Sequence, residues 1–72
     1  MYTLAKRIAN FIWENGDWYE LRDKYDTFGE LLADTLQSLA DKAKRKAIIQ
    51  WLADCETETE YAQKLITEVE AI

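Results

Sequence analysis

Ahead of three predicted helical segments the chain repeats one local pattern, in which an Asp or a Thr is followed three residues later by a Glu. The pairs are Asp17 with Glu20, Thr27 with Glu30, and Thr57 with Glu60. The first side chain of such a capping box accepts a hydrogen bond from a backbone N–H at a helix start, and the glutamate completes the box. The pattern therefore predicts short helices that begin near residues 17, 27 and 57.

Another helix is predicted to precede these three, over residues 3–15. Its apolar residues recur at helical spacing and Gly16 follows as a stop signal; they are Leu4, Ala5, Ile8, Phe11 and Ile12. The helix that Asp17 opens should run to about Tyr25. Because both flanks are helical, the Asn15-Gly16 pair is interpreted as a joint between helices and not as a hairpin turn.

The segment after Thr27 carries two apolar rows that do not lie on one side of a straight helix. The first row is Phe28, Leu32, Leu36 and Leu39, and the second is Ile48, Trp51, Leu52 and Cys55. The second row lies roughly 100° to 200° around the cylinder from the first. We therefore expect a break near residues 38–41, where Ser38 or Asp41 caps a fourth helix.

The last predicted helix follows Thr57 and turns a third apolar row inward, namely Tyr61, Ala62, Leu65, Ile66, Val69 and Ile72. The sequence of 72 residues contains no proline and two glycines, and no alternating strand pattern interrupts the helical signals. The predicted fold is an all-α, compact bundle of four or five short helices, with residues 1–72 as a single domain. A domain of this size buries only about 60% of its unfolded surface, so its core is small.

Several kinds of chemistry have few candidate residues here. The chain has no histidine and one cysteine, Cys55, so it lacks the usual ligand sets for zinc and cannot form an internal disulfide. Ser38 is the only serine, with no histidine to activate it. No apolar run approaches the roughly 18 residues that span a bilayer. We expect a cytoplasmic protein that is not an enzyme and has no cofactor, metal or membrane partner.

Aromatic residues gather around the corner at Gly16, and they give the first candidate site. Trp18 shares a helical stripe with Leu21 and Tyr25, which predicts core packing. Trp13 lies about 180° from Leu4, so its helix is apolar on two sides. Such a helix is either central in the bundle or exposes one side to a partner. The candidate protein-binding surface is Tyr2, Trp13 and Tyr19, with a polar rim of Glu14, Asn15 and Asp17.

Charged residues give two further candidates. A basic cluster, Lys42, Lys44, Arg45 and Lys46, lies near a helix start and is interpreted mainly as a solvated face, with phosphate contact as the functional alternative. Residues 54–72 hold six acidic side chains against Lys64 alone, while residues 1–53 hold eight of each sign. The acidic-face candidates are Glu56, Glu58, Glu60, Glu68 and Glu70.

These observations predict a protein-interaction module or small regulator that binds a partner protein, or binds itself as a homodimer. The alternative is an acidic inhibitor that mimics nucleic acid and occupies the basic cleft of a nucleic-acid-binding enzyme, as a mobile element could encode. A third hypothesis is weak nucleic-acid binding through the cluster from Lys42 to Lys46, which the net charge of −5 disfavours.

Overall fold

Five helices follow one another in the part of the chain that the structure describes. The structure is a computed structural model, and it describes residues 2–54 and 59–72. The helices are α1 (Tyr2–Asn15), α2 (Trp18–Lys24), α3 (Phe28–Ala40), α4 (Lys42–Asp54) and α5 (Thr59–Glu70). No strand occurs in these two ranges, so the prediction of an all-α bundle of short helices is confirmed.

Capping side chains begin two helices where the sequence predicted them. The Asp17 carboxylate accepts a hydrogen bond from the N–H of Tyr19 (2.9 Å), and the Thr27 hydroxyl accepts one from the N–H of Glu30 (3.2 Å). The Glu30 carboxylate reaches back to the N–H of Asp26 (3.1 Å), one residue before the cap. These bonds satisfy backbone donors that have no partner within the helix. The predicted third box falls on Thr57, which lies outside the described residues.

The predicted break between the third and fourth helices is confirmed, and Asp41 is the residue that makes it. Its backbone is extended, with φ −108° and ψ 121°. Its carboxylate accepts hydrogen bonds from the N–H groups of Ala43 (2.8 Å) and Lys44 (3.3 Å). Ser38, the other capping candidate, is instead buried within α3. A single N-cap side chain therefore separates the two helices without glycine or proline.

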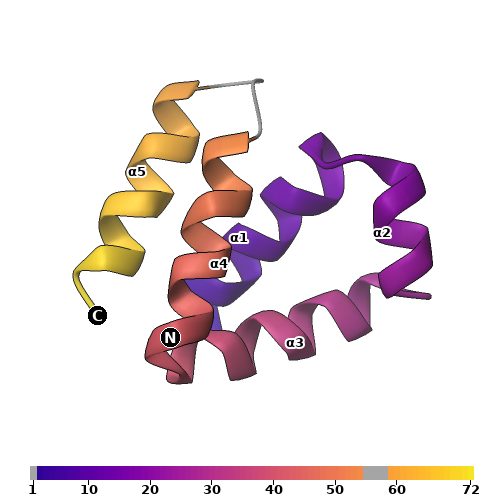
Figure 1. Cartoon of the computed structure of the whole chain (residues 1–72), viewed down its shortest axis with the longest axis horizontal. Coiled ribbons are helices and arrows are strands. Elements are labelled where there is room, and N and C mark those ends of the chain that lie inside the picture. The colour runs from indigo at the N-terminus through magenta and orange to yellow at the C-terminus, as the bar shows by residue number, and fades with distance from the viewer. Residues whose placement is uncertain (1, 55–58) are drawn as a thin grey trace.

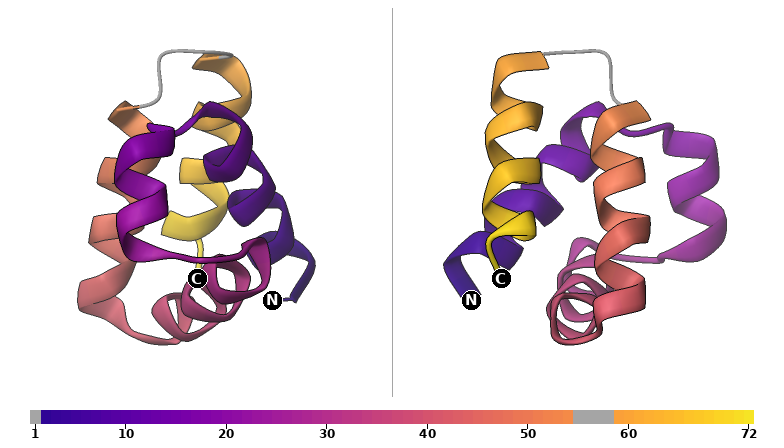
Figure 2. Two further views of the ribbon diagram at one scale, coloured as in Figure 1. Left: turned by 90° about the vertical axis from the view of Figure 1, so that its right-hand side faces the viewer. Right: turned by 60° about the vertical axis from the view of Figure 1, so that its left-hand side comes forward.

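The helices pack around α1. It contacts α3 and α5, and α4 contacts the same two helices. In Figure 1, α4 and α5 run side by side in opposite directions, and α2 stands at the other end of the molecule from α5. The right-hand view of Figure 2 shows the same separation of α2 and α5. The radius of gyration is 11.1 Å, close to the roughly 11 Å of a compact chain of this length.

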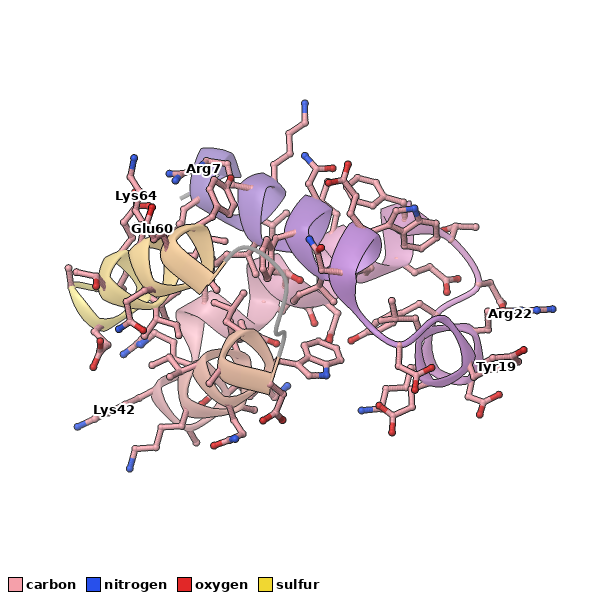
Figure 3. All side chains as sticks on the ribbon, turned by 90° about the horizontal axis from the view of Figure 1, so that it is seen from above. Arg7, Tyr19, Arg22, Lys42, Glu60 and Lys64 are labelled. Atoms are coloured by element: carbon pink, nitrogen blue, oxygen red, sulfur yellow. The ribbon has the colours of Figure 1, made fainter. Side chains whose placement is uncertain are left out.

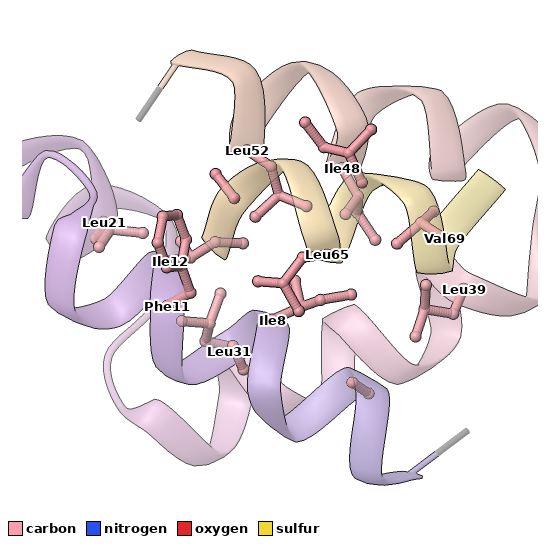
Figure 4. Close-up of a cluster of buried hydrophobic side chains, with 14 residues drawn as sticks. Ile8, Phe11, Ile12, Leu21, Leu31, Leu39, Ile48, Leu52, Leu65 and Val69 are labelled. Atoms are coloured by element: carbon pink, nitrogen blue, oxygen red, sulfur yellow. The ribbon is translucent and has the colours of Figure 1, made fainter. Parts of the chain in front are cut away.

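One hydrophobic core takes side chains from all five helices, as the close-up in Figure 4 shows. Leu65 of α5 lies in its middle, and Leu21, the one buried side chain described on α2, lies at its edge. The buried apolar residues are Ala5, Ile8, Ala9, Phe11, Ile12, Leu21, Leu31, Leu39, Ile48, Leu52, Ala62, Leu65, Ile66 and Val69.

The buried face of α3 differs from the predicted row. Leu31, Thr35, Ser38 and Leu39 are buried, whereas Phe28, Leu32 and Leu36 are only partly buried. The buried face is rotated toward Thr35 and Ser38, because these polar side chains are small. The Thr35 hydroxyl also donates a hydrogen bond to the carbonyl of Leu31 (2.8 Å). A hydroxyl satisfied within its own helix can be buried at little cost.

The two apolar sides of α1 have a structural explanation. Ala9 is fully buried, and Trp13 is half-buried with its ring edge-to-face on Phe28 of α3, at a centroid distance of 5.6 Å. The opposite side, with Ile8 and Phe11, is buried as well. Both sides of α1 therefore carry buried or half-buried side chains that pack within the bundle. The side chain of Tyr2 lies outside the described part of the chain.

Two residues predicted to point inward from the last helix are partly exposed. Tyr61 is 36% exposed and stacks on Phe11 of α1 at 5.6 Å, so it covers the edge of the core. Ile72 is 43% exposed because it lies beyond the end of α5. Cys55, placed in the second apolar row by its spacing, falls outside the described residues.

Candidate protein-binding groove

The aromatic residues of the predicted contact surface have different surroundings. Trp13 packs on α3 and the core, whereas Tyr19 is 82% exposed. Figure 3 shows Tyr19 and Arg22 projecting from α2 away from the bundle. Of the three aromatic candidates, Tyr19 is thus the one whose described side chain is open to solvent.

The polar rim of that surface has local roles near the α1–α2 joint. The Asn15 side chain donates to the carbonyl of Phe11 (3.1 Å), and Asp17 caps α2. Glu14 is exposed. Asn15 and Asp17 also line a hollow on the side of α2 that faces α4.

Gly16 determines how closely α2 approaches α1. Its N–H donates to the carbonyl of Ile12 (2.7 Å). A Cβ at this position would lie 2.6 Å from that carbonyl oxygen, closer than real Cβ atoms come, and 3.1 Å from Cδ1 of Leu21, which is a tight contact. Glycine is therefore required for close packing, and it places α2 beside the end of α1.

Two adjoining hollows lie beside α4, the smaller against α1 and α2 and the larger against α3 and the end of α2, and both are bounded by Trp51 and Asp54. The smaller has a volume of about 150 Å³ and is lined by Ile12, Asn15, Gly16, Asp17, Glu20, Leu21, Trp51 and Asp54. The larger has a volume of about 420 Å³ and is lined by Lys24, Tyr25, Asp34, Ser38, Lys44, Ala47, Ile48, Gln50, Trp51 and Asp54. These residues together define the α2–α4 groove.

Aromatic rings and one lysine bridge the groove. The Trp51 ring of α4 is tilted by 48° against Tyr25, with their centroids 6.3 Å apart. The Lys24 ammonium lies over Trp51, 5.2 Å from the ring centroid. Because Lys24 ends α2 and Tyr25 follows it, both contacts hold the end of α2 against α4.

The Tyr25 hydroxyl is fixed by a carboxylate on α3. It donates a hydrogen bond of 2.5 Å to Oδ2 of Asp34. Burial raises the pKa of the Tyr25 hydroxyl, and the hydrogen bond and the charge of Asp34 raise it further. The hydroxyl therefore remains protonated as a donor, and one wall of the groove is held in place.

The groove lies in the most acidic part of the described chain. Residues 14–34 hold seven acidic and two basic side chains. Four carboxylates line the groove, from Asp17, Glu20, Asp34 and Asp54, against the two ammonium groups of Lys24 and Lys44. A negative field across an apolar cleft favours a cationic partner over an anionic one.

The acidic-face candidates do not form one continuous row in the described residues. Glu56 and Glu58 lie outside them, while Glu60 and Glu70 are exposed at opposite ends of α5. Glu68 pairs with Arg7 of α1: Nη1 donates to Oε1 (2.9 Å), and Nη2 lies 2.9 Å from Oε2. The hydrogen bond to Arg7 lowers the pKa of the Glu68 carboxyl. Glu68, one of the acidic-face candidates, therefore joins α5 to α1.

The basic cluster lies where α4 begins beside the ends of α3 and α5. Arg45 donates to the carbonyl of Leu39 (2.8 Å) at the end of α3. A shallow hollow of about 300 Å³ brings the cluster to the end of α5, lined by Lys42, Arg45, Lys46, Ile49, Val69, Glu70 and Ile72. Cations oppose the dipole at the start of α4, but two neighbouring helix C-termini favour them. Lys42, Lys44 and Lys46 are exposed.

Lys24, Tyr25 and Trp51 were not among the binding residues that the sequence predicted. Trp51 lies at about 80° from the middle of the buried Ile48–Leu52 row, at 100° per residue. That edge position is the sequence signal for a half-buried ring. Which element faces the ring depends on the direction of α2, and the spacing does not encode it.

The described ranges, 2–54 and 59–72, contain neither a cluster of metal-ligand side chains nor a membrane-spanning helix. There, no three His, Cys, Asp or Glu side chains come together as a metal site would require. No helix in those ranges has the length and apolar character to cross a bilayer. Comparison of the chain with protein-family models, with curated proteins and with solved structures found no match.

Proposed function

We propose that this chain is a non-enzymatic binding module whose α2–α4 groove receives a segment of another protein. The observation that carries the proposal is the larger hollow, with its volume of about 420 Å³ and its two aromatic walls, Tyr25 and Trp51. Trp and Tyr are enriched among residues that dominate binding energy. The groove also offers polar groups at its edges, as interface rims do.

The groove replaces part of the contact surface that the sequence predicted. Trp13 supports the core through Phe28, so its loss would act first on folding. Tyr19, on α2, remains a candidate for extending the contact along the outer side of that helix. The proposed surface thus keeps α2 and exchanges Trp13 for Trp51.

Charge supports another protein over a second copy of this chain. In a two-fold symmetric dimer the same patch meets itself. A dimer built on the groove would then bring together two net-negative surfaces, each with four carboxylates and two ammonium groups. Like charges across an interface are costly, so a partner of different composition fits the groove better.

The experiment blocks the groove without removing a core side chain. Ala47 and Ala53 are both exposed on α4, and Ala47 lines the larger hollow whereas Ala53 lines neither hollow. Tagged wild type, Ala47→Trp and Ala53→Trp would be compared in affinity capture from a lysate of the native host. The proposal predicts a stoichiometric protein held by wild type and Ala53→Trp and lost by Ala47→Trp. Equal capture by all three, or capture of none, would contradict it.

The acidic-inhibitor hypothesis proposes a different surface for the same chain. The exposure of Glu60 and Glu70 supports it, while the pairing of Glu68 with Arg7 leaves that carboxylate less available. It predicts that Glu60→Lys with Glu70→Lys abolishes partner capture and that Ala47→Trp does not. The reverse pattern would exclude it in favour of the groove.

A further inference from the structure

We infer that the segment received by the α2–α4 groove carries a Lys or Arg side chain, which takes the place of Lys24 over the Trp51 ring. The occupant is thus a basic, partly apolar segment of a partner protein. This inference rests on the proposed function, because it names the partner chemistry of the same groove.

Lys24 occupies in the free chain the position proposed for the partner's cation. Its ammonium lies 5.2 Å from the centroid of Trp51, and its side chain lines the larger hollow. Lys24 is exposed, so the contact stays in exchange with solvent. A cation over a tryptophan ring at such a site favours binding about two- to fivefold. A partner cation can therefore displace Lys24, and Lys24 weakens partner binding by a similar factor.

The walls around Trp51 fit a cation with apolar neighbours. The smaller hollow beside Trp51 presents the carboxylates of Asp17 and Glu20, and Asp54 lines both hollows. The larger hollow beside the same ring presents the apolar side chains of Ala47 and Ile48. The basic group would lie on the ring near the carboxylates, and an adjacent apolar side chain would enter the larger hollow.

The carboxylates of the groove already accept some hydrogen bonds, but they keep acceptor sites for a cation of the partner. Asp34 is engaged with the Tyr25 hydroxyl, and Asp54 accepts a hydrogen bond from the side chain of Gln50 (3.1 Å). Asp17 accepts from the N–H of Tyr19 through Oδ1. A carboxylate has about four acceptor sites, so these bonds do not saturate it. An acidic or phosphorylated segment would instead meet like charge at four positions.

The test uses a defined probe and a matched pair of charge variants. A short amphipathic peptide of leucine and lysine would be titrated by calorimetry at about 0.15 M salt, where long-range attraction is screened. Lys24→Gln and Lys6→Gln remove one positive charge each from exposed positions, and Lys6 lines neither hollow. Lys24→Gln should bind about two- to fivefold more tightly than Lys6→Gln. Equal affinities would overturn the displacement of Lys24.

A second pair of variants tests the carboxylates. Glu20→Gln removes a groove carboxylate, and Glu60→Gln removes an exposed carboxylate on α5. The inference predicts weaker peptide binding by Glu20→Gln alone and loss of binding by Ala47→Trp. Unchanged affinity in Ala47→Trp would show attraction outside the groove and overturn the inference.

Reversal of the peptide charge separates the inference from the proposed function. A leucine–glutamate peptide should bind wild type at least tenfold more weakly than the leucine–lysine peptide. If the glutamate peptide bound better and Ala47→Trp blocked it, the cationic occupant would be wrong while the groove remained a binding site. Failure of the proposed function is scored separately, by equal protein capture by wild type and Ala47→Trp.

Discussion

The Lys24 ammonium lies 5.2 Å from the centroid of the Trp51 ring, and this contact joins the end of α2 to α4 across an open groove. The rest of α2 is held through Leu21, which enters the edge of the core, and through the hydrogen bond from Tyr25 to Asp34. A short helix is thus fixed at a few points beside the bundle. The groove exists because α2 is held at these points and does not pack along the length of α4.

Substitution of Trp13 tests whether this ring is structural. Trp13→Ala should lower the free energy of unfolding by about 3 kcal/mol, because the ring packs on Phe28 and the core. Urea denaturation measures the change. Tyr19→Ala is the control, since an 82% exposed side chain should change stability by less than about 0.5 kcal/mol. A stable Trp13→Ala variant that lost partner binding would restore the contact role predicted from the sequence.

The two glycines should respond in opposite directions to alanine. Gly16→Ala should destabilise the fold by about 1 to 3 kcal/mol, because the new Cβ would meet the Ile12 carbonyl oxygen at 2.6 Å. Gly29→Ala should stabilise it by about 0.5 to 1 kcal/mol, since its nearest neighbour, Oγ1 of Thr27, lies 3.6 Å away and alanine is a better helix former. Thermal unfolding of both variants checks the contrast, and equal shifts would contradict it.

The ion pair between Arg7 and Glu68 predicts a pH dependence of stability. The pKa of the Glu68 carboxyl is lowered from its ordinary value of 4.5, first by the Arg7 hydrogen bond. A carboxyl whose pKa is lower in the folded state stabilises the fold above the unfolded pKa, and this contribution is lost as the pH falls through the folded value. Wild type should therefore exceed Glu68→Gln in stability at pH 7, and the difference should vanish in acid.

Denaturant titrations between pH 7 and acid measure that difference. The effect should be small because the pair is in contact with solvent. Glu60→Gln, which removes an exposed carboxylate from the same helix, is the control. An equal pH dependence in wild type and Glu68→Gln would show that the pair does not contribute.

Removal of one hydroxyl tests the attachment of α2. Tyr25→Phe loses the hydrogen bond to Asp34 and should destabilise the fold by about 1 kcal/mol. Because the bond ties the end of α2 to α3, amide hydrogen exchange should speed up in α2 more than in α5. Tyr19→Phe provides the control on an exposed ring. Uniform exchange rates in Tyr25→Phe would argue against a local role.

The sequence predicted the helices well because their starts are encoded locally. Asp17 and Thr27 cap the helices they were expected to cap. Asp41, one of the two capping candidates, caps α4 and separates it from α3. The buried face of α3 was misplaced because a count of apolar residues passes over Thr35, whose hydroxyl is satisfied by the Leu31 carbonyl. Local pattern thus predicts where a helix begins better than it predicts which side is buried.

The groove could not be predicted in the same way. Trp51 and Lys24 are 27 positions apart in the sequence, and they meet only because Gly16 lets α2 turn closely beside the end of α1. The pairing of Arg7 with Glu68, 61 positions apart, was missed for a similar reason. Both contacts depend on tertiary arrangement, which helical spacing does not specify.

The central claim is that a partner protein binds in the α2–α4 groove, and mapping of amide and indole signals by nuclear magnetic resonance tests it most directly. The labelled chain would be titrated with the purified partner from the capture experiment. The account predicts that the largest shifts fall on the Trp51 indole and on Tyr25 and Ala47. Largest shifts at Glu60 and Glu70 of α5, or at the cluster from Lys42 to Lys46, with the Trp51 indole unmoved, would contradict it.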